Sequence, residues 1–167
     1  HCAGAMTDLY PPKPAIAARS RIGSRADYDR LYAQSIADPS NFWDREAARL
    51  AFFHPYHTVS GGTFAKADFQ WFVGGKLNVS YNCVDRHLEK KREHTALIWA
   101  GDAPGEYRRI SYGELFENVC RLANVLLAHG VRRGDRVCIY MPMIPETVYA
   151  MLACARIGAI HSVVFAG

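Results

Sequence analysis

Two apolar runs joined by a helical segment constrain the fold of this chain more than any other feature. Residues 136–140 and 160–165 are short, mostly apolar runs of the kind found in strands inside a sheet. Pro145 and Glu146 suit the first turn of a helix between them, and Gly158 suits its end. Parallel strands need such a crossover, so the pattern predicts a βαβ unit and an α/β protein with a parallel core.

Another helix and a pair of strands are expected just before this unit. Ser111 and Glu114 match the capping box, in which each side chain accepts a backbone N–H at the helix start. Gly130 stands where the left-handed conformation would end that helix. Residues 96–100 and 107–110 flank turn residues, which predicts a β-hairpin.

The N-terminal part is expected to be peripheral to this core. Residues 7–26 are rich in Pro, Ala and Arg without a helical or strand period, which predicts a surface arm or disorder. The N-terminal arm is therefore expected over residues 1–26, and residues 27–167 would form one structural unit. Asp27 is predicted to cap a helix that ends before Asp38, and Asn41 is predicted to cap the next helix.

The middle of the chain is expected to supply a hairpin and a helix. Residues 69–73 and 76–79 flank Gly74-Gly75, and two glycines favour the tight turns that join paired strands. A helix is then predicted over residues 80–92, with apolar side chains spaced for one face.

Composition limits the class of protein. The chain has 167 residues, of which 50% are hydrophobic and 22% charged, as in a globular domain. The net charge of +4 comes from short, scattered basic clusters, so no nucleic-acid partner is expected. Apolar runs of membrane-spanning length are absent, and five scattered cysteines indicate a reducing, cytoplasmic location. Residues 1–6 could be a remnant of the expression vector, with Met6 as the native start.

Several residues resemble fragments of chemical sites without completing one. His54 with His57, and Cys83 with His87, each lack the second pair that a tetrahedral metal site needs, so no metal site is predicted. Gly74-Gly75-Lys76 lacks the Ser or Thr and the spacing of a phosphate loop.

No catalytic residue is predicted in this chain. Cys138 and Cys154 lie in apolar segments and are expected to be buried and unreactive. His161 adjoins Ser162 in a strand, where neighbouring side chains point to opposite faces, so the two cannot act as a base and nucleophile. A core histidine is the expected role for His161, and a residue that lines a crevice is the less favoured alternative.

Two stretches lie where a ligand would bind an open parallel sheet. Residues 141–146 and 165–167 follow the carboxyl ends of the two predicted strands, and ligands bind outside that edge. Small residues there let the backbone approach a ligand, and an aromatic ring can stack on a base. A plain strand-to-helix corner is equally compatible with these residues.

Longer motifs resemble AMP-forming acetyl-CoA synthetase (acetate–CoA ligase), a family of the adenylate-forming superfamily. The resemblance covers about residues 30–167. The matching stretches are 41–43, 77–88, 96–102, 110–115, 140–143 and 152–164.

The resemblance implies a ligase that makes acetyl-CoA from acetate, ATP and coenzyme A through an acetyl-AMP intermediate, with Mg²⁺. It implies the fold of the large domain of adenylate-forming enzymes, with a parallel βαβ core, peripheral helices and a β-hairpin. Phe165-Ala166-Gly167 is similar to the Phe-Gly-Gly that lines the coenzyme A site of the family. Phe165, Ala166 and Gly167 would therefore contact coenzyme A, although alanine replaces a glycine.

The main departure from the family is length. The ATP loop, the acidic residues for ribose and magnesium, the catalytic lysine and the acetate pocket have no counterpart in these 167 residues. The chain is therefore expected to be an N-terminal part truncated before the ATP loop, marginally stable and inactive by itself.

Three alternatives stay open at this point. Propionyl-CoA synthetase shares Met-Pro-Met at 141–143 and the stretch at 153–159. A non-catalytic module for dimer contact or regulation is a second reading. A dinucleotide-binding domain is a third, disfavoured because no glycine fingerprint follows residues 136–140.

Overall fold

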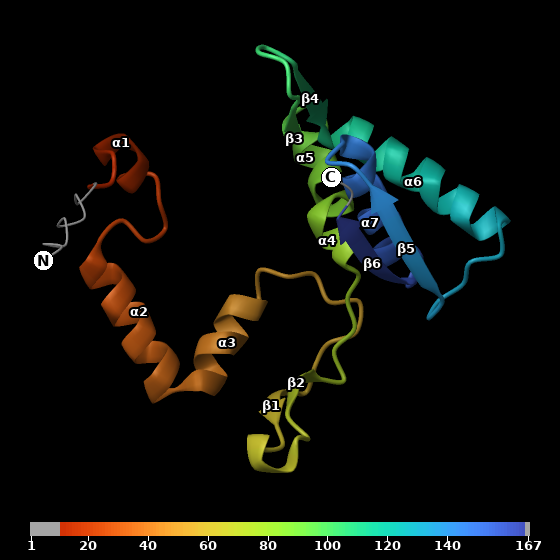
Figure 1. The fold of residues 1–167 in the computed structure, drawn as a ribbon. Helices are drawn as coiled ribbons and strands as arrows, with labels where there is room; N and C mark the ends of the chain where they lie inside the picture. Colours follow the sequence, from red (N-terminus) through yellow and green to blue (C-terminus); the bar gives the residue numbers. More distant parts are fainter. Residues whose placement is uncertain (1–10, 166–167) are drawn as a thin grey trace, which may run out of the picture. The chain divides into compact units, whose positions relative to one another are not determined.

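The chain divides into two units, with the division between Arg49 and Leu50. The computed structural model describes residues 11–165, with Phe165 described by its backbone alone. Figure 1 follows the elements along the chain. The domain boundary after residue 26 that the sequence suggests stays a prediction.

The first unit consists of short helices. Ser24, not Asp27, caps the second of them, because the Ser24 hydroxyl accepts the Asp27 N–H at 3.1 Å. Asp38, not Asn41, caps the third, because its carboxylate accepts the Asn41 N–H at 3.2 Å. Both predicted caps were placed one turn late, since Asp and Asn in a first turn resemble a cap in composition. The helices are α1 (Pro14–Ala17), α2 (Arg25–Ala37) and α3 (Pro39–Ala47).

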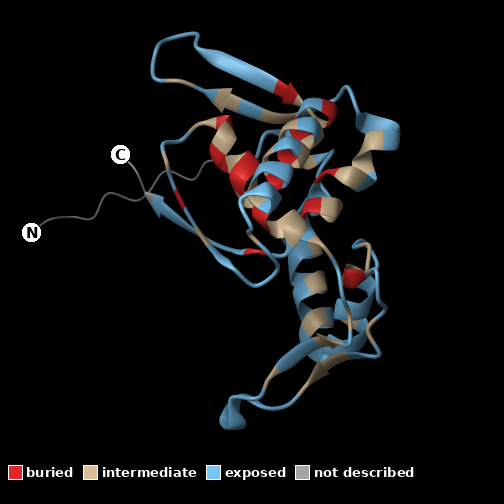
Figure 2. Cartoon of the chain, turned by 90° about the vertical axis from the view of Figure 1, so that its right-hand side faces the viewer, coloured by how far each residue is buried: buried red, intermediate tan, exposed pale blue. Residues whose placement is uncertain are grey.

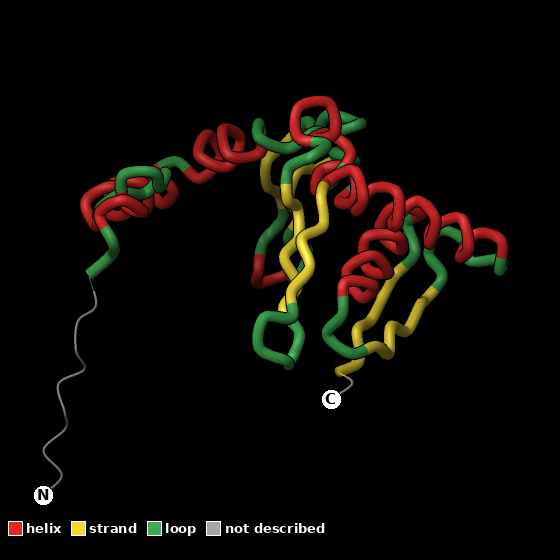
Figure 3. The backbone as a smooth tube through the Cα atoms, turned by 90° about the horizontal axis from the view of Figure 1, so that it is seen from above, coloured by secondary structure: helices red, strands yellow, loops and turns green. Residues whose placement is uncertain are grey.

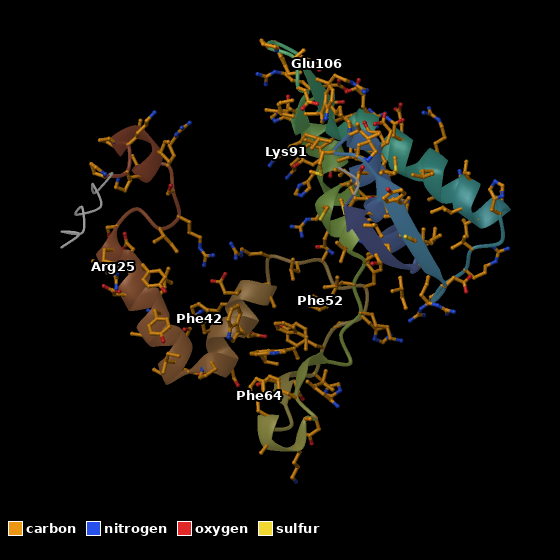
Figure 4. The ribbon with its side chains drawn as sticks, in the orientation of Figure 1. Arg25, Phe42, Phe52, Phe64, Lys91 and Glu106 are labelled. Carbon is orange, nitrogen blue, oxygen red and sulfur yellow. The ribbon has the colours of Figure 1, made fainter. Side chains whose placement is uncertain are left out.

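In the described part of the second unit, the strands form two-stranded sheets. The predicted hairpin of β3 with β4 is confirmed as an antiparallel pair, and the predicted parallel pair is confirmed as β5 with β6. Glu106, labelled in Figure 4, lies in the turn between β3 and β4, where its C=O accepts the Gly101 N–H at 2.8 Å. The strands are β1 (Thr58–Gly61), β2 (Gln70–Val73), β3 (Thr95–Ala100), β4 (Tyr107–Ser111), β5 (Arg136–Met141) and β6 (Ile160–Phe165).

The hairpin predicted around Gly74-Gly75 is wrong. Strand β2 pairs with β1 and not with residues 76–79. Lys76 instead forms an isolated bridge to His54. The Asn78 side chain then caps helix α4 (Val79–Cys83), and the start of a helix at this point leaves no room for a strand.

The helix predicted over residues 80–92 is broken into three pieces. Helix α4 is followed by a 3₁₀ turn, η2 (Asp85–His87), and by a short helix, α5 (Leu88–Lys91). The break falls at Val84, whose φ of −124° and ψ of −68° are not helical. Val84 is fully buried, so the chain leaves helical geometry at a residue whose side chain belongs to the core.

Helix α6 (Tyr112–Ala128) begins with the predicted capping box. The Glu114 N–H donates to Ser111 Oγ at 3.2 Å, and the Ser111 N–H donates to Glu114 Oε2 at 2.8 Å. These bonds, the backbone one foremost, lower the pKa of the Glu114 carboxyl. Gly130 adopts a φ of +88° after the helix, as predicted.

The core of the second unit forms where α7 (Pro145–Ile157) meets its neighbours. Helix α7 packs against α6, α4 and both strands of the parallel pair. Figure 2 shows the buried residues concentrated on these helices and at the adjoining strand ends. Burial of apolar side chains is the dominant favourable contribution to folding, so this cluster is the main source of the unit's stability. The core cluster comprises Val84, Ile110, Leu115, Val119, Ala123, Tyr149 and Ala153.

The helices cover one face of the β5–β6 pair. Along β5, Ile139 is buried against them, whereas Cys138 and Tyr140 on the opposite face are exposed. The prediction that Cys138 is buried is therefore wrong, because in residues 11–165 no element packs on that face. Cys154, on α7, is fully buried as predicted.

Within residues 11–165, no helix combines the length and the apolar character that crossing a membrane requires.

Replacing Val119 by alanine tests this core. Val119 is fully buried on α6, so Val119→Ala should lower the free energy of unfolding by about 2 kcal/mol through lost contacts and a cavity. Val125 lies on the same helix with 46% of its surface exposed, and Val125→Ala should change stability by less than about 0.5 kcal/mol. Urea denaturation measures both, and equal effects would contradict the assigned core.

Candidate functional site

The carboxyl edge of the β5–β6 pair is the candidate site. The parallel register places Met141 opposite Phe165, so the two strands end at the same edge. Figure 3 shows both strands running out to the same side of the unit. This edge is where open α/β sheets bind ligands.

One half of this edge lies outside the described residues. Ala166 and Gly167, and the side chain of Phe165, belong to that part. Their contact with coenzyme A therefore stays a prediction. The other half is the loop from Pro142 to Ile144, which is described in full.

Hydrogen bonds hold the backbone of this loop. The Thr147 hydroxyl donates to the Pro142 C=O at 2.7 Å, and the Ile144 N–H donates to the same oxygen at 2.8 Å. Thr147 itself is buried, whereas 79% of the Met143 surface is exposed. The loop therefore has a fixed backbone with an exposed, flexible side chain at its tip.

The β3–β4 ribbon also contacts the loop. Trp99 Nε1 on β3 donates to the Met143 C=O at 2.7 Å. Arg108 on β4 lies 3.8 Å from Glu146 in the first turn of α7. Both side chains of that ion pair are exposed, so it contributes little, and the indole bond is the stronger constraint. Sequence reasoning missed Trp99, because its partner is 44 residues away and no spacing rule joins them.

A partly buried ion pair positions the C-terminal end of α7. The guanidinium of Arg156 donates to both carboxylate oxygens of Asp85, at 2.7 and 2.8 Å, and lies 5.1 Å from the ring of Phe116. The hydrogen bonds to Asp85 raise the pKa of Arg156. Such a bidentate pair fixes orientation as well as distance, so η2 and α7 are held in register. Asn78 Nδ2 adds bonds to the C=O groups of Ala155 and Arg156, at 3.0 and 3.1 Å.

The histidines and cysteines of the described part do not gather into a metal site. No group of three or more His, Cys, Asp or Glu side chains there is arranged to hold a metal ion. His57 instead packs against Gly74, where a Cβ would lie 2.8 Å from the imidazole ring.

Cys154 and His161, the other residues considered for a catalytic role, do not belong to the loop. Burial raises the pKa of the Cys154 thiol, which disfavours the reactive thiolate. His161 was expected in the core, but it is exposed along a hollow of about 410 Å³ that Cys83 also lines. His161 lines this hollow together with Met151 and Leu152 of α7, so it borders a crevice and is not enclosed in the core.

Comparison with known proteins gives a consistent result along the chain. A family model described as AMP-binding enzyme matches residues 84–167, and one described as acetyl-coenzyme A synthetase N-terminus matches residues 28–83.

The curated relatives are much longer than this chain. "Acetyl-coenzyme A synthetase 2" of Pseudomonas aeruginosa is 55% identical over 160 residues, which are 95% of this chain and 25% of the relative. "Acetyl-coenzyme A synthetase" of Dictyostelium discoideum is 49% identical over 160 residues, which are 95% of this chain and 24% of that relative. The chain thus spans about a quarter of these relatives.

The fold has a match among solved structures. "Acetoacetyl-CoA Synthetase from Streptomyces lividans" superposes with a TM-score of 0.76 at 30% identity, over 91% of this chain and 24% of that one.

Replacing Trp99 by phenylalanine tests the bracing of the loop. Trp99→Phe keeps an aromatic ring but removes the bond to Met143, which should cost about 1 kcal/mol locally. Amide hydrogen exchange at Ile144 should accelerate about fivefold. Tyr107→Phe is a matched control, since Tyr107 is 61% exposed on the adjoining strand and its hydroxyl bonds to no described residue. Unchanged exchange in Trp99→Phe would show that the loop does not depend on the indole.

Proposed function

The chain belongs to the AMP-binding enzyme family, and we propose that it is the N-terminal part of an acetate–CoA ligase of the AMP-forming type. The observation that carries the proposal is the order and extent of the two matching families, which together span residues 28–167. Relatives with about half of their aligned residues identical bear the name acetyl-coenzyme A synthetase. The fold is that of adenylate-forming enzymes, α/β with a parallel pair in its core.

The proposed reaction has two half-steps. A carboxylate oxygen of acetate attacks the α-phosphate of ATP, which forms acetyl-AMP and releases pyrophosphate. The thiol of coenzyme A then attacks the acyl carbon, and AMP leaves. The first step needs compensation of phosphate charge, and the second needs exclusion of water from the mixed anhydride.

We propose that this chain supplies one wall of the coenzyme A site. The braced loop follows β5 at the edge where β6 ends, and the resemblance assigns coenzyme A contacts to Phe165, Ala166 and Gly167, so we propose that a ligand at this edge contacts both. The Ala166 methyl group would narrow the approach of backbone to ligand relative to glycine. As the resemblance implies, ATP and Mg²⁺ would depend mainly on residues after 167.

We further propose that the 167 residues alone do not catalyse the reaction. The Ser/Thr/Gly-rich ATP loop with its lysine and the catalytic lysine, which the resemblance implies for the ligase, have no counterpart in these residues. A cytoplasmic location fits the described cysteines, all of which are free thiols.

Exchange of radiolabelled pyrophosphate into ATP tests the proposed activity. A full-length protein that contains this chain should catalyse exchange that depends on acetate, and the 167-residue chain should catalyse none. Propionate in place of acetate should support slower exchange, and faster exchange would favour a propionate ligase. No exchange with either acid would support a non-catalytic module, and exchange by the short chain would refute its inactivity.

Replacing Ala166 by leucine tests the coenzyme A contact. In the full-length protein, Ala166→Leu should raise the KM for coenzyme A about tenfold or more, because the larger side chain occupies the proposed approach of the ligand. Acetate-dependent pyrophosphate exchange precedes coenzyme A binding and should be unchanged, so it serves as the internal control. An unchanged KM would remove residue 166 from the site.

A further inference from the structure

A second concave region lies at the opposite end of the β5–β6 pair. It encloses about 660 Å³, and this region is called the basic hollow below. It borders the start of β6, whereas the candidate coenzyme A site follows its end, roughly 16 Å further along the strand. Its lining includes Phe53, Lys76, Asn78, Arg133, Arg156 and Gly158.

Lys76 reaches the hollow from a segment with a fixed backbone. Its N–H donates to the His54 C=O at 3.0 Å, and its C=O accepts the N–H of Phe53 at 2.7 Å and of His54 at 3.1 Å. The ammonium group has no ion pair or hydrogen bond to any residue that the structure describes. Backbone hydrogen bonds thus position Lys76, while its positive charge forms no interaction with the residues that the structure describes.

Arg133 reaches the hollow from the other side. Its aliphatic stem lies over Gly158, where an added Cβ would be 3.0 Å from Arg133 Cγ. The turn that carries it is held by a bond from the Gly134 N–H to the Gly158 C=O, at 2.9 Å. The guanidinium, like the Lys76 ammonium, bonds to no residue within the described range 11–165.

The carbonyl groups at the C-terminus of α7 already have hydrogen-bond donors. Carbonyl groups at a helix C-terminus attract cations, which is the simplest structural role for Lys76 and Arg133. The Asn78 amide, however, already donates to the C=O groups of Ala155 and Arg156. The Gly158 N–H also donates to the Ala155 C=O, and the Ala159 N–H donates to the Cys154 C=O. Arg156 is neutralised by Asp85. The lining therefore carries two uncompensated positive charges.

We propose that the basic hollow binds a small phosphorylated molecule with a flat apolar part. A phosphate monoester carries a charge of about −2 near neutral pH, which matches the two cations better than a single carboxylate does. The guanidinium fork suits two phosphate oxygens, and the ammonium group suits the third. Phe53 lines the hollow with 61% of its surface exposed, so its aromatic ring is available to the apolar part.

Calorimetric titration of the 167-residue chain with phenyl phosphate tests the proposal, with inorganic phosphate as the second probe. Phenyl phosphate should bind saturably at one site and more tightly than phosphate. Lys76→Gln and Arg133→Gln should each weaken binding about tenfold by removing a charged hydrogen bond. Lys90→Gln is the matched control, because it removes an exposed positive charge from α5, outside the hollow.

Urea denaturation of each variant separates binding from folding. Folded variants of Lys76 and Arg133 with weakened binding support the proposal. Absence of saturable binding by the unaltered chain overturns it, as does an equal loss in Lys90→Gln. Unaltered binding together with lowered stability in the two variants would leave the cations with a purely structural role at α7. Because pyrophosphate exchange is not measured here, failure leaves the proposed ligase activity untouched.

Discussion

Burial of α7 on nearly all of its sides is the constraint on which the second unit depends. The helix must pack against α6, α4 and the β5–β6 pair at once, and Ala150, Ala153 and Cys154 are small enough to allow that approach. The parallel pairing of β5 with β6 follows, because a helix that crosses between two strands and packs on their sheet sets them side by side in the same direction. The packing of α7 therefore determines where the carboxyl edge of the β5–β6 pair, the candidate site, lies.

Sequence patterns predicted the elements whose signals are local. The capping box at Ser111, the glycine that ends α7 and the strands on either side of that helix all depend on neighbours within a few residues. The hairpin at Gly74-Gly75 failed for the opposite reason. The turn itself was predicted correctly, since Gly74 has a φ of +81°. The partner of β2, however, was decided by β1 and by the Asn78 cap, and the two glycines carry no information about either.

The candidate site shows the same limit at the level of single contacts. Strand order and direction predicted which edge matters, because the βαβ pattern makes the two strands parallel and so brings their carboxyl ends to the same edge. The bond from Trp99 to the loop and the pair of Arg156 with Asp85 join residues 44 and 71 positions apart, respectively. Contacts of that separation are created by tertiary packing, so neither could be inferred from spacing in one sequence. The exposure of Cys138 likewise depends on which faces are covered, and not on its own apolar surroundings.

Helix α7 also determines how the two proposed ligand regions can influence each other. Its first turn follows the braced loop, and its last turn borders the basic hollow, about 20 Å away along the helix. A molecule in the hollow would stabilise the unit by mass action, whatever its effect on the other end. It would change the affinity for coenzyme A only if it preferred one of two positions of α7, because coupling requires different contacts in two states. The Asp85 clamp and the all-round packing of α7 favour a single position, so the two regions should bind their ligands independently.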